Sequence, residues 1–447
     1  MLKSLHTGKD VFVIFDVGKT HKKMLLFDPS YKVVKEESSE FPTIKDEDGF
    51  EADDIQLIST WVKVKITELS SDPSWNILGI NFTAYGATLV NLDETGNPVT
   101  VLYNYLKPIE PHIEEEFYSL FGGRDKFATE TSSPPMGMLN AGFQLYWLKY
   151  HKPDLFKTIH RSLFLPQYLS FLVTGRQCSE LTSIGCHTGL WNFRQNDFHS
   201  WVYDEWMQNV LAPISQDPIA GYIEIRGKMV PVGVGLHDSS ASLLPYLYMS
   251  EDSFLVLSTG TWAITLNPFN HSPLTAEELA SDVLAYMLPN GEPVKAARLL
   301  MGMEHDIHVS RIAKAYHLPG HFYESIKWDE SIYNENTSIP DNFIHSTQGI
   351  WNMEVYENGM RAYYALLRGL LNLLIRAFNM VDIPSITTVF VDGGFARNPV
   401  FMQMLKKKLP RKRFITSKVP EATAFGSLIY LRQPERIDLS DENTILL

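Results

Sequence analysis

The residues best placed for chemistry in this 447-residue chain stand in short polar motifs that follow apolar runs. The first motif, DVGKT, extends from Asp16 to Thr20. Gly18 allows a tight turn whose backbone N–H groups can approach an anion, and Asp16 could hold Mg²⁺ directly or through water. A P-loop needs an earlier glycine at the position of Val13, so that interpretation is rejected. The alternative is an ordinary hairpin turn that contains Asp and Gly.

Two further glycine turns stand in the second half of the chain. Thr259, Gly260 and Thr261 follow an apolar run, and their hydroxyl and backbone N–H groups suit contact with a phosphate. Gly393 and Gly394 follow another apolar run and precede an apparent helix, so a nucleotide base or ribose could lie against bare backbone there. Each turn taken alone is equally typical of a purely structural turn.

Near the middle of the chain, His237 and Asp238 precede the apparent helix Ser239–Tyr248. The carboxylate of Asp238 could accept a proton from a substrate hydroxyl as a general base. The competing interpretation is that Asp238 caps the N-terminus of this helix.

The elements that must position the first motif follow the order β-β-β-α-β. Apolar alternation and turn signals predict three strands joined by short connections, then an amphipathic helix and further strands. The predicted ranges are Val11–Phe15, Met24–Phe27, Tyr31–Phe41, Asp53–Leu69, Trp75–Phe82 and Ala87–Leu92.

A similar plan returns in the second half, around the two later glycine turns. The predicted strands and helices there are Phe254–Ser258, Trp262–Leu266, a long helix at Glu354–Met380, Ile386–Val391 and a helix at Asn398–Leu409. We therefore expect two domains, at residues 1–248 and 249–447. The polar stretch 267–350 gives no clear prediction of elements.

Composition indicates a globular protein, with 45% apolar and 20% charged residues. The net charge of −13 argues against nucleic acid or an anionic membrane as a partner. Two cysteines, Cys178 and Cys186, are too few for a disulfide scaffold, so we expect a reducing, cytoplasmic compartment. No signal peptide is expected at the N-terminus, and no membrane span at Ala365–Val381, because Arg368 and Arg376 interrupt it.

The order of the motifs resembles that of the FGGY carbohydrate kinases, which belong to the actin/hexokinase/Hsp70-like ATPase superfamily. The resemblance extends over nearly the whole chain, through DxG, a mid-chain HD, STGTW and a late DGGxxxN. Phe164–Gly175 and Glu421–Gly426 resemble two further family segments, "LPDYL…LTG" and "EATALG". His237–Ser242, Ser258–Trp262 and Leu299–Met303 are most similar to the rhamnulokinase and fuculokinase branch.

This resemblance implies an α/β protein of two RNase H-like, actin-like ATPase domains with an active-site cleft between them. The first domain would bind sugar and the second ATP, with Mg²⁺ near Asp16 and Asp238 as general base. The resemblance and the motifs together assign nucleotide contacts to Gly18, Lys19, Thr20, Thr259, Gly260, Thr261, Gly393, Gly394 and Asn398. Substrate contacts are assigned to Tyr85, Gly86, His237 and Asp238.

Several positions depart from the family pattern. Lys19 stands where Thr or Ala is usual, and it could bind phosphate or pair with a nearby carboxylate. Thr88 replaces an Asp of the sugar site, and Asn104 and Tyr105 replace two more polar residues. The leading hypothesis is phosphorylation of a ketose or deoxyketose, such as L-rhamnulose or L-fuculose, at O1. The alternative is a nucleotide-binding regulatory or scaffold protein on the same fold; a homodimer is compatible with either.

Overall fold

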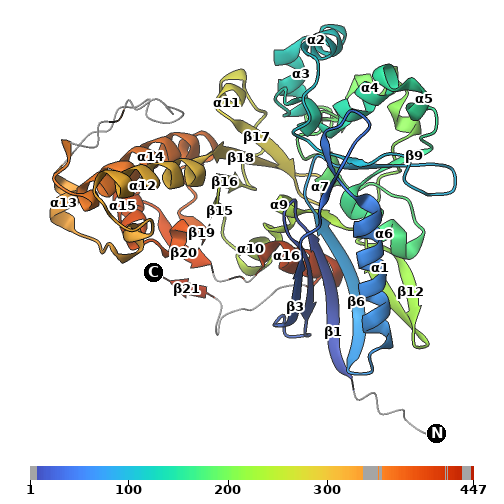
Figure 1. Cartoon of the computed structure of the whole chain (residues 1–447), viewed down its shortest axis with the longest axis horizontal. Coiled ribbons are helices and arrows are strands. Elements are labelled where there is room, and N and C mark those ends of the chain that lie inside the picture. The colour runs from blue at the N-terminus through green and yellow to red at the C-terminus, as the bar shows by residue number, and fades with distance from the viewer. Residues whose placement is uncertain are drawn as a thin grey trace.

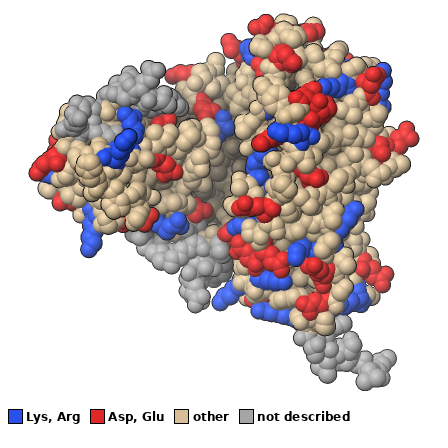
Figure 2. Space-filling view, in the orientation of Figure 1, with Lys and Arg blue, Asp and Glu red and all other residues tan. Residues whose placement is uncertain are grey.

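The computed structural model describes residues 8–335, 351, 355–417, 419, 421–434 and 444–446. It has two seven-stranded mixed sheets, one in each half of the chain (Figure 1). The space-filling view shows the surface hollowed between the halves (Figure 2). The expected α/β architecture of two similar units is present.

The first sheet has the order β12-β13-β6-β1-β2-β3, with β14 also paired to β6. Its strands are β1 (Lys9–Val17), β2 (Lys22–Phe27), β3 (Val33–Ser39), β6 (Trp75–Ala84), β12 (Ile219–Ile225), β13 (Lys228–Gly233) and β14 (Leu236–His237). Strand β1 lies between antiparallel β2 and parallel β6, so its residues from Val11 onward are mostly buried. Helix α1 (Ile55–Ser71) begins at Asp54, whose carboxylate accepts from the backbone N–H groups of Gln56 and Leu57.

The second sheet has the order β17-β18-β16-β15-β19-β20-β21. Its strands are β15 (Phe254–Thr259), β16 (Ala263–Asn267), β17 (Val283–Met287), β18 (Pro293–Leu299), β19 (Thr388–Gly393), β20 (Arg413–Ser417) and β21 (Thr444–Leu446). The helices of this half are α11 (Ala276–Ala280), α12 (Met301–Ala315), α13 (Glu330–Asn334), α14 (Gly359–Val381) and α15 (Pro399–Lys408). Strand β15 pairs with β16 and β19 as β1 pairs with β2 and β6, so the β-strand plan of the first half is repeated.

Helix α14 is the one helix in the described part of the chain with the length and composition to cross a membrane. Arg368 and Arg376 therefore do not exclude a span by themselves, contrary to the expectation from sequence. The packing is more informative, because 56% of the apolar window is buried inside the protein and the helix contacts α12 and β18. This is the behaviour of a core helix.

A lobe of short helices is inserted between β6 and β12 (Figure 1). It contains the helices α2 (Pro111–Leu120), α3 (Arg124–Thr131), α4 (Ala141–His151), α5 (Pro153–Phe156), α7 (Leu181–Ile184) and α8 (Ser200–Asp204), while α6 (Leu165–Thr174) returns to pack on β6 and β12 of the first sheet. Its short strands are β7 (Leu89–Leu92), β8 (Leu102–Tyr103), β9 (Arg161–Phe164), β10 (Trp191–Asn192) and β11 (Asp197–Phe198), and β8 joins β4 (Thr43–Lys45) and β5 (Glu51–Asp53).

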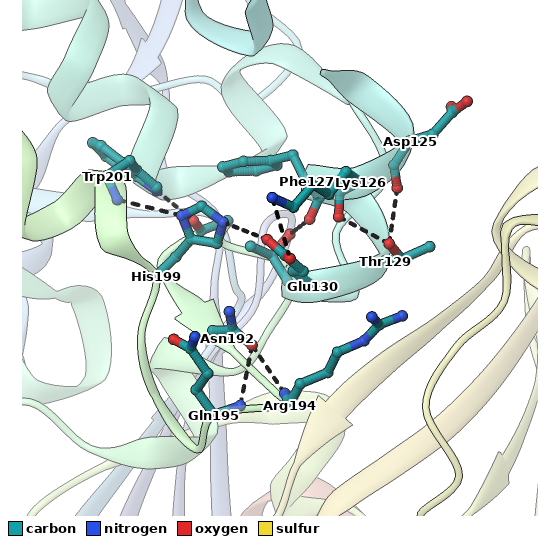
Figure 3. A network of polar contacts seen from close by, with 12 residues as sticks. Asp125, Lys126, Phe127, Thr129, Glu130, Asn192, Arg194, Gln195, His199 and Trp201 are labelled. Carbon is teal, nitrogen blue, oxygen red and sulfur yellow. Dashed lines mark hydrogen bonds and ion pairs between the residues drawn. The ribbon is translucent and has the colours of Figure 1, made fainter. Parts of the chain in front are cut away.

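A buried histidine links two parts of this lobe (Figure 3). His199 follows the β10–β11 hairpin, and its Nε2 lies 3.1 Å from Oε2 of Glu130 on α3. Its Nδ1 accepts from the backbone N–H of Trp201 at 3.3 Å, which leaves the ring proton on Nε2 to be donated to Glu130. This pair fastens α3 to the hairpin, and α3 in turn contacts α11 of the second half.

The predicted elements are present with three differences. The strand expected at Ala87–Leu92 is the shorter β7, and it pairs with β9 outside the main sheet because the chain turns into the lobe after β6. The helix expected at Ser239–Tyr248 is divided into α9 (Asp238–Ala241) and α10 (Leu244–Met249), with Pro245 in the first turn of α10. The helix expected at Glu354–Met380 is α14, which begins only at Gly359 because Asn358 caps it; Glu354 itself lies outside the described residues.

The last helix, α16 (Ala422–Arg432), returns to the first sheet and packs on β6, β1 and α9. Nδ2 of Asn81 donates to the Ser427 carbonyl at 2.8 Å, and the Ser427 hydroxyl donates to the Phe82 carbonyl at 3.1 Å. A Cβ at Gly426 would lie 1.8 Å from the carbonyl oxygen of Ala241, so only glycine allows this approach. The boundary at 248/249 separates the two sheets and stays a prediction, but α16 lies beyond it and packs on the first sheet.

Candidate active site

The first motif and the mid-chain HD motif meet at one edge of the first sheet. Ala84, the last residue of β6, pairs with Val17 on one side and with His237 on the other. All three strands run parallel, so Asp16 and Asp238 lie at neighbouring strand ends. Sequence spacing alone did not give this register.

Both carboxyl groups lie where ionisation is costly. Burial, together with the charges of Asp238 and Glu421, raises the pKa of Asp16 to about 7, against an opposing effect of Lys23. Burial also raises the pKa of Asp238 to about 6, although hydrogen bonds from Ser239 lower it. Asp238 is thus a carboxylate whose pKa lies close to neutral pH, as an efficient general base requires.

His237 provides a second polar contact to Asp238, beside the hydrogen bonds from Ser239. Its Nε2 lies 3.1 Å from Oδ1 of Asp238 and 3.0 Å from Sγ of Cys186, while its Nδ1 lies 3.2 Å from Oγ of Ser240. Burial lowers the pKa of His237 to about 3, so the imidazole is neutral. The hydrogen-bond partners of the ring are Sγ of Cys186 at Nε2 and Oγ of Ser240 at Nδ1, and the tautomer decides which atom donates in each pair.

Gly86 makes room for this histidine. A Cβ at position 86 would lie 2.8 Å from Sγ of Cys186 and 3.0 Å from Nε2 of His237. The ring of His237 also lies 5.5 Å from that of Tyr286 on β17, so the second half of the chain forms part of its surroundings. Cys178 and Cys186 are both free thiols, and both are buried.

The first glycine turn closes with a hydrogen bond from Gly18 N to the His21 carbonyl at 2.9 Å. Lys19 leaves this turn toward a carboxylate: its Nζ lies 2.6 Å from Oδ2 of Asp53. The hydroxyl of Tyr85 donates to the same oxygen at 2.5 Å, and Nζ of the buried Lys22 lies 3.9 Å from the other. Of the two roles considered for Lys19, the structure shows the pairing with a carboxylate.

Tyr105 is close to this group. Nζ of Lys19 lies 5.5 Å from the ring centres of both Tyr85 and Tyr105. Burial raises the pKa of Tyr105, and the charges of Asp238 and Asp53 raise it further. The predicted substrate residue Tyr85 and the variant position Tyr105 thus flank an ion pair on the same side of the site as Asp238.

The other two positions that differ from the family pattern, Thr88 and Asn104, make hydrogen bonds within the protein. The Thr88 hydroxyl donates to the Tyr85 carbonyl at 2.9 Å, and Oδ1 of Asn104 accepts from Leu106 N at 3.0 Å. Both contacts shape the local turns.

The two later glycine turns are joined by adjacent parallel strands. Thr259 at the end of β15 pairs with Gly393 at the end of β19, and Gly394 N donates to the Thr259 carbonyl at 2.7 Å. Gly393 has φ +90, and a Cβ there would lie 2.1 Å from the Thr259 carbonyl oxygen. The Thr259 hydroxyl donates to the Asp392 carbonyl at 2.5 Å, so this hydroxyl binds the protein rather than pointing freely into the site.

A cavity of about 550 Å³ opens beside these turns. It is lined by both turns, by the first turn of α12 and by three aromatic side chains, at Thr259, Gly260, Thr261, Gly302, Gly394, His305, Tyr323, Phe395 and Asn398. Gly302 permits α12 to approach the turn, since a Cβ there would lie 2.1 Å from the Gly260 carbonyl oxygen. The ring of His305 lies 4.9 Å from each of the Tyr323 and Phe395 rings. Glycine backbone beside aromatic rings suits a flat heterocycle with a phosphate tail.

Asn398 lines the cavity, as expected, but its amide is committed to the protein. Its Oδ1 accepts from Val400 N and Phe401 N, each at 3.1 Å, and caps α15. Its Nδ2 donates to the hydroxyl of Tyr363 at 2.6 Å.

The arrangement of carboxylates fits a cation that also binds phosphate. Asp16 faces the charges of Asp238 and Glu421, with Lys23 as the opposing charge. In the described residues, no three His, Cys, Asp or Glu side chains come close enough to hold a metal by themselves. Mg²⁺ is commonly bound by one or two carboxylates together with phosphates and water, and Asp16 fits that pattern.

Several residues of the site were not predicted from the sequence. Asp53, Lys22 and Cys186 enter through contacts between distant segments, for which the sequence has no local signal. His305 and Tyr323 lie in the stretch where the sequence predicts no clear elements. The only local sign of close packing in the sequence was the presence of glycine at Gly86 and Gly302, where a side chain would meet neighbouring atoms.

The comparisons with known proteins cover both halves. Residues 11–244 match the N-terminal domain of the FGGY family of carbohydrate kinases, and residues 251–438 match the C-terminal domain of carbohydrate kinase FGGY. A probable L-xylulose kinase of Haemophilus influenzae is 21% identical, over 94% of this chain and 90% of its own. A rhamnulokinase of Oceanobacillus iheyensis is also 21% identical, over 80% of this chain and 79% of its own.

Solved structures share the fold. A carbohydrate kinase from Novosphingobium aromaticivorans has a TM-score of 0.77 at 23% identity, covering 96% of this chain and 93% of its own. A xylulose kinase from Lactobacillus acidophilus has a TM-score of 0.75 at 16% identity, covering 95% of this chain and 89% of its own. The chain therefore has the actin-like ATPase fold and belongs to the FGGY family of carbohydrate kinases.

Proposed function

We propose that this carbohydrate kinase transfers the γ-phosphoryl group of ATP to O1 of a ketose or deoxyketose, such as L-rhamnulose or L-fuculose, with Asp238 as general base. The observation that carries the proposal is the placement of Asp238. Its carboxylate is partly buried at the end of β14, has a pKa of about 6 and lies 3.1 Å from a neutral His237. A rhamnulokinase and a probable L-xylulose kinase among the relatives support a ketose as the acceptor.

In the proposed reaction, Asp238 takes the proton of the sugar hydroxyl as its oxygen attacks the γ-phosphorus. The bond from phosphorus to the β,γ-bridging oxygen breaks, and the products are a sugar phosphate and ADP. Phosphoryl transfer depends mainly on alignment and charge neutralisation, which Mg²⁺ held near Asp16 would assist when bound. The neutral His237 ring lies 3.1 Å from this carboxylate, whose Oδ1 accepts from the backbone N–H and the hydroxyl of Ser239.

The nucleotide would lie along the glycine turns. The turns at Gly18–Thr20 and Thr259–Thr261 would face the phosphates, although the N–H groups of Gly18 and Gly260 are donated within these turns, and Gly393, Gly394 and Asn398 would line the adenosine pocket. Support comes from the 550 Å³ cavity beside the last two turns. Lys19 is assigned to Asp53 and the sugar side, because its ammonium is already paired there.

An ADP-release assay across ketoses, aldoses and polyols tests this function. The proposal expects ADP release that depends on the sugar and is greatest with a ketose. Measurable ATP binding with no sugar-stimulated ADP release would favour the alternative, a nucleotide-binding regulatory or scaffold protein. Phosphate at a position other than O1, found by NMR of the product, would contradict the proposed acceptor atom.

A further inference from the structure

A buried carboxylate outside the proposed reaction lies behind the HD motif. Glu180 is 1% exposed and stands immediately before α7. Its Oε2 accepts from the backbone N–H of Thr182 at 2.9 Å and from the Thr182 hydroxyl. Its Oε1 has no hydrogen-bond partner within the described part of the chain.

The Thr182 hydroxyl connects this carboxylate to the site. His237 N donates to Oγ1 of Thr182 at 3.0 Å. A hydroxyl carries one proton and two lone pairs, so donation to Glu180 turns a lone pair toward the His237 N–H. The carboxylate therefore sets the orientation of the hydroxyl, and the hydroxyl holds the backbone immediately before Asp238.

Other contacts hold the same segment along the strand and at the His237 ring. Strand β14 has only two residues, and its pairing with β6 ends at His237. The preceding Gly235 is held by Asn81, whose Oδ1 accepts from Gly235 N at 3.1 Å, and by Gln167, whose Nε2 donates to the Gly235 carbonyl at 2.8 Å. Along the chain, the hydrogen bond from His237 N to Thr182 is the last of these contacts before Asp238.

We infer that Glu180 and Thr182 are positioning residues that hold His237 and Asp238 in the orientation needed for proton transfer; the inference rests on the proposed role of Asp238. A cap for the four-residue helix α7 does not require a buried Glu, because a shorter polar residue would serve there at lower desolvation cost. Burial raises the pKa of Glu180 to about 7, which shows how unfavourable the site is for a carboxylate. The link through Thr182 to the base gives the group a function beyond capping.

The test compares Thr182→Val, which removes the hydroxyl at constant shape, with Thr182→Ser, which keeps it. We expect kcat to fall roughly 10- to 100-fold in the valine variant, with the Kd for ATP unchanged, and to recover in the serine variant. The matched control is Thr131→Val, which removes another buried hydroxyl, one bonded to the Phe127 carbonyl in the lobe. Equal kcat in the two valine variants would overturn the inference. Thr182→Ala replaces the valine variant if the latter does not fold.

A second arm separates this inference from the proposed function. In an Asp238→Asn background, Thr182→Val is expected to cause no further loss, because its effect passes through Asp238. A further loss of the same factor would show that Thr182 acts elsewhere and would overturn the inference. Near-normal turnover in Asp238→Asn alone would instead contradict the proposed base.

Discussion

Lys19 and Asp53, 34 positions apart, form a 2.6 Å ion pair that turns the lysine of the first glycine turn away from a phosphate role. Tyr85 donates to the same carboxylate, and the ring centre of Tyr105 lies 5.5 Å from Nζ of Lys19 and 6.4 Å from the ring centre of Tyr85. This arrangement places the most unusual residue of the motif beside the proposed sugar rather than the nucleotide.

Substitution of Lys19 by Met is therefore expected to change sugar binding selectively. Without the ammonium of Lys19, the nearest cation to Asp53 is Lys22, at 3.9 Å. The hydroxyl of Tyr85 then donates to a carboxylate oxygen that no longer contacts Lys19. We expect the KM for sugar to rise about tenfold, since breaking a partly buried pair costs more than an exposed one. The Kd for ATP should stay within about threefold, because the ammonium of Lys19 is paired with Asp53. A loss of ATP affinity with an unchanged KM for sugar would show that Lys19 binds phosphate.

The rate should depend on pH through Asp238. A raised pKa means that this carboxyl is protonated, and unable to accept a proton, over a wider acidic range than an ordinary Asp. At saturating Mg²⁺ and ATP, kcat/KM for sugar is expected to rise between pH 5 and 7 around a pKa of about 6, and then to level. Initial rates from pH 5 to 9 check this, and a flat profile below pH 7 would be inconsistent with the proposed base.

Gly86→Ala should disturb the base without touching it directly. The new Cβ would lie 2.8 Å from Sγ of Cys186 and 3.0 Å from Nε2 of His237, so one of these side chains must move. A displacement of His237 is expected to lower kcat by about tenfold or more. Adding Cys186→Ala should restore part of the loss by making room. Gly320→Ala is the matched control, because a Cβ there meets no atom within 4 Å.

Glu180→Gln should change how stability varies with pH. Because the pKa of Glu180 is raised to about 7 in the folded protein, the folded state holds a proton that the unfolded state has lost. This contribution is favourable below the ordinary pKa and disappears as pH rises to about 7, at a cost of up to about 3 kcal/mol. Urea unfolding should therefore show Glu180→Gln gaining stability relative to the parent between pH 5 and 8. A difference independent of pH would contradict the raised pKa.

The strand ends and turns could be predicted because glycines and apolar runs mark them locally. DVG, STG and DGG each follow a strand, and the structure brings STG and DGG together through the pairing of Thr259 with Gly393. The order of motifs was also sufficient to indicate the family. These features depend on short stretches of sequence or on their order along the chain.

The remaining parts of the site depend on contacts between distant segments. The pairing of Lys19 with Asp53, the return of α16 to the first sheet and the bond from His237 to Thr182 each join segments at least 34 residues apart. No periodicity or turn signal specifies such partners. The sequence contains glycines at Gly86 and Gly426, but it does not indicate which atoms pack against them. Those atoms belong to distant residues, Cys186 and His237 for Gly86 and Ala241 for Gly426.

The central claim is that Asp238 removes the proton from the sugar hydroxyl. Its most direct test is the single-turnover rate of phosphoryl transfer in Asp238→Asn, measured with ATP binding and with Asp154→Asn as an exposed control. We predict a rate roughly 10² to 10⁴ times lower in Asp238→Asn, with ATP affinity and the control unchanged. A rate within about threefold of the parent would contradict the assignment of Asp238 as the base.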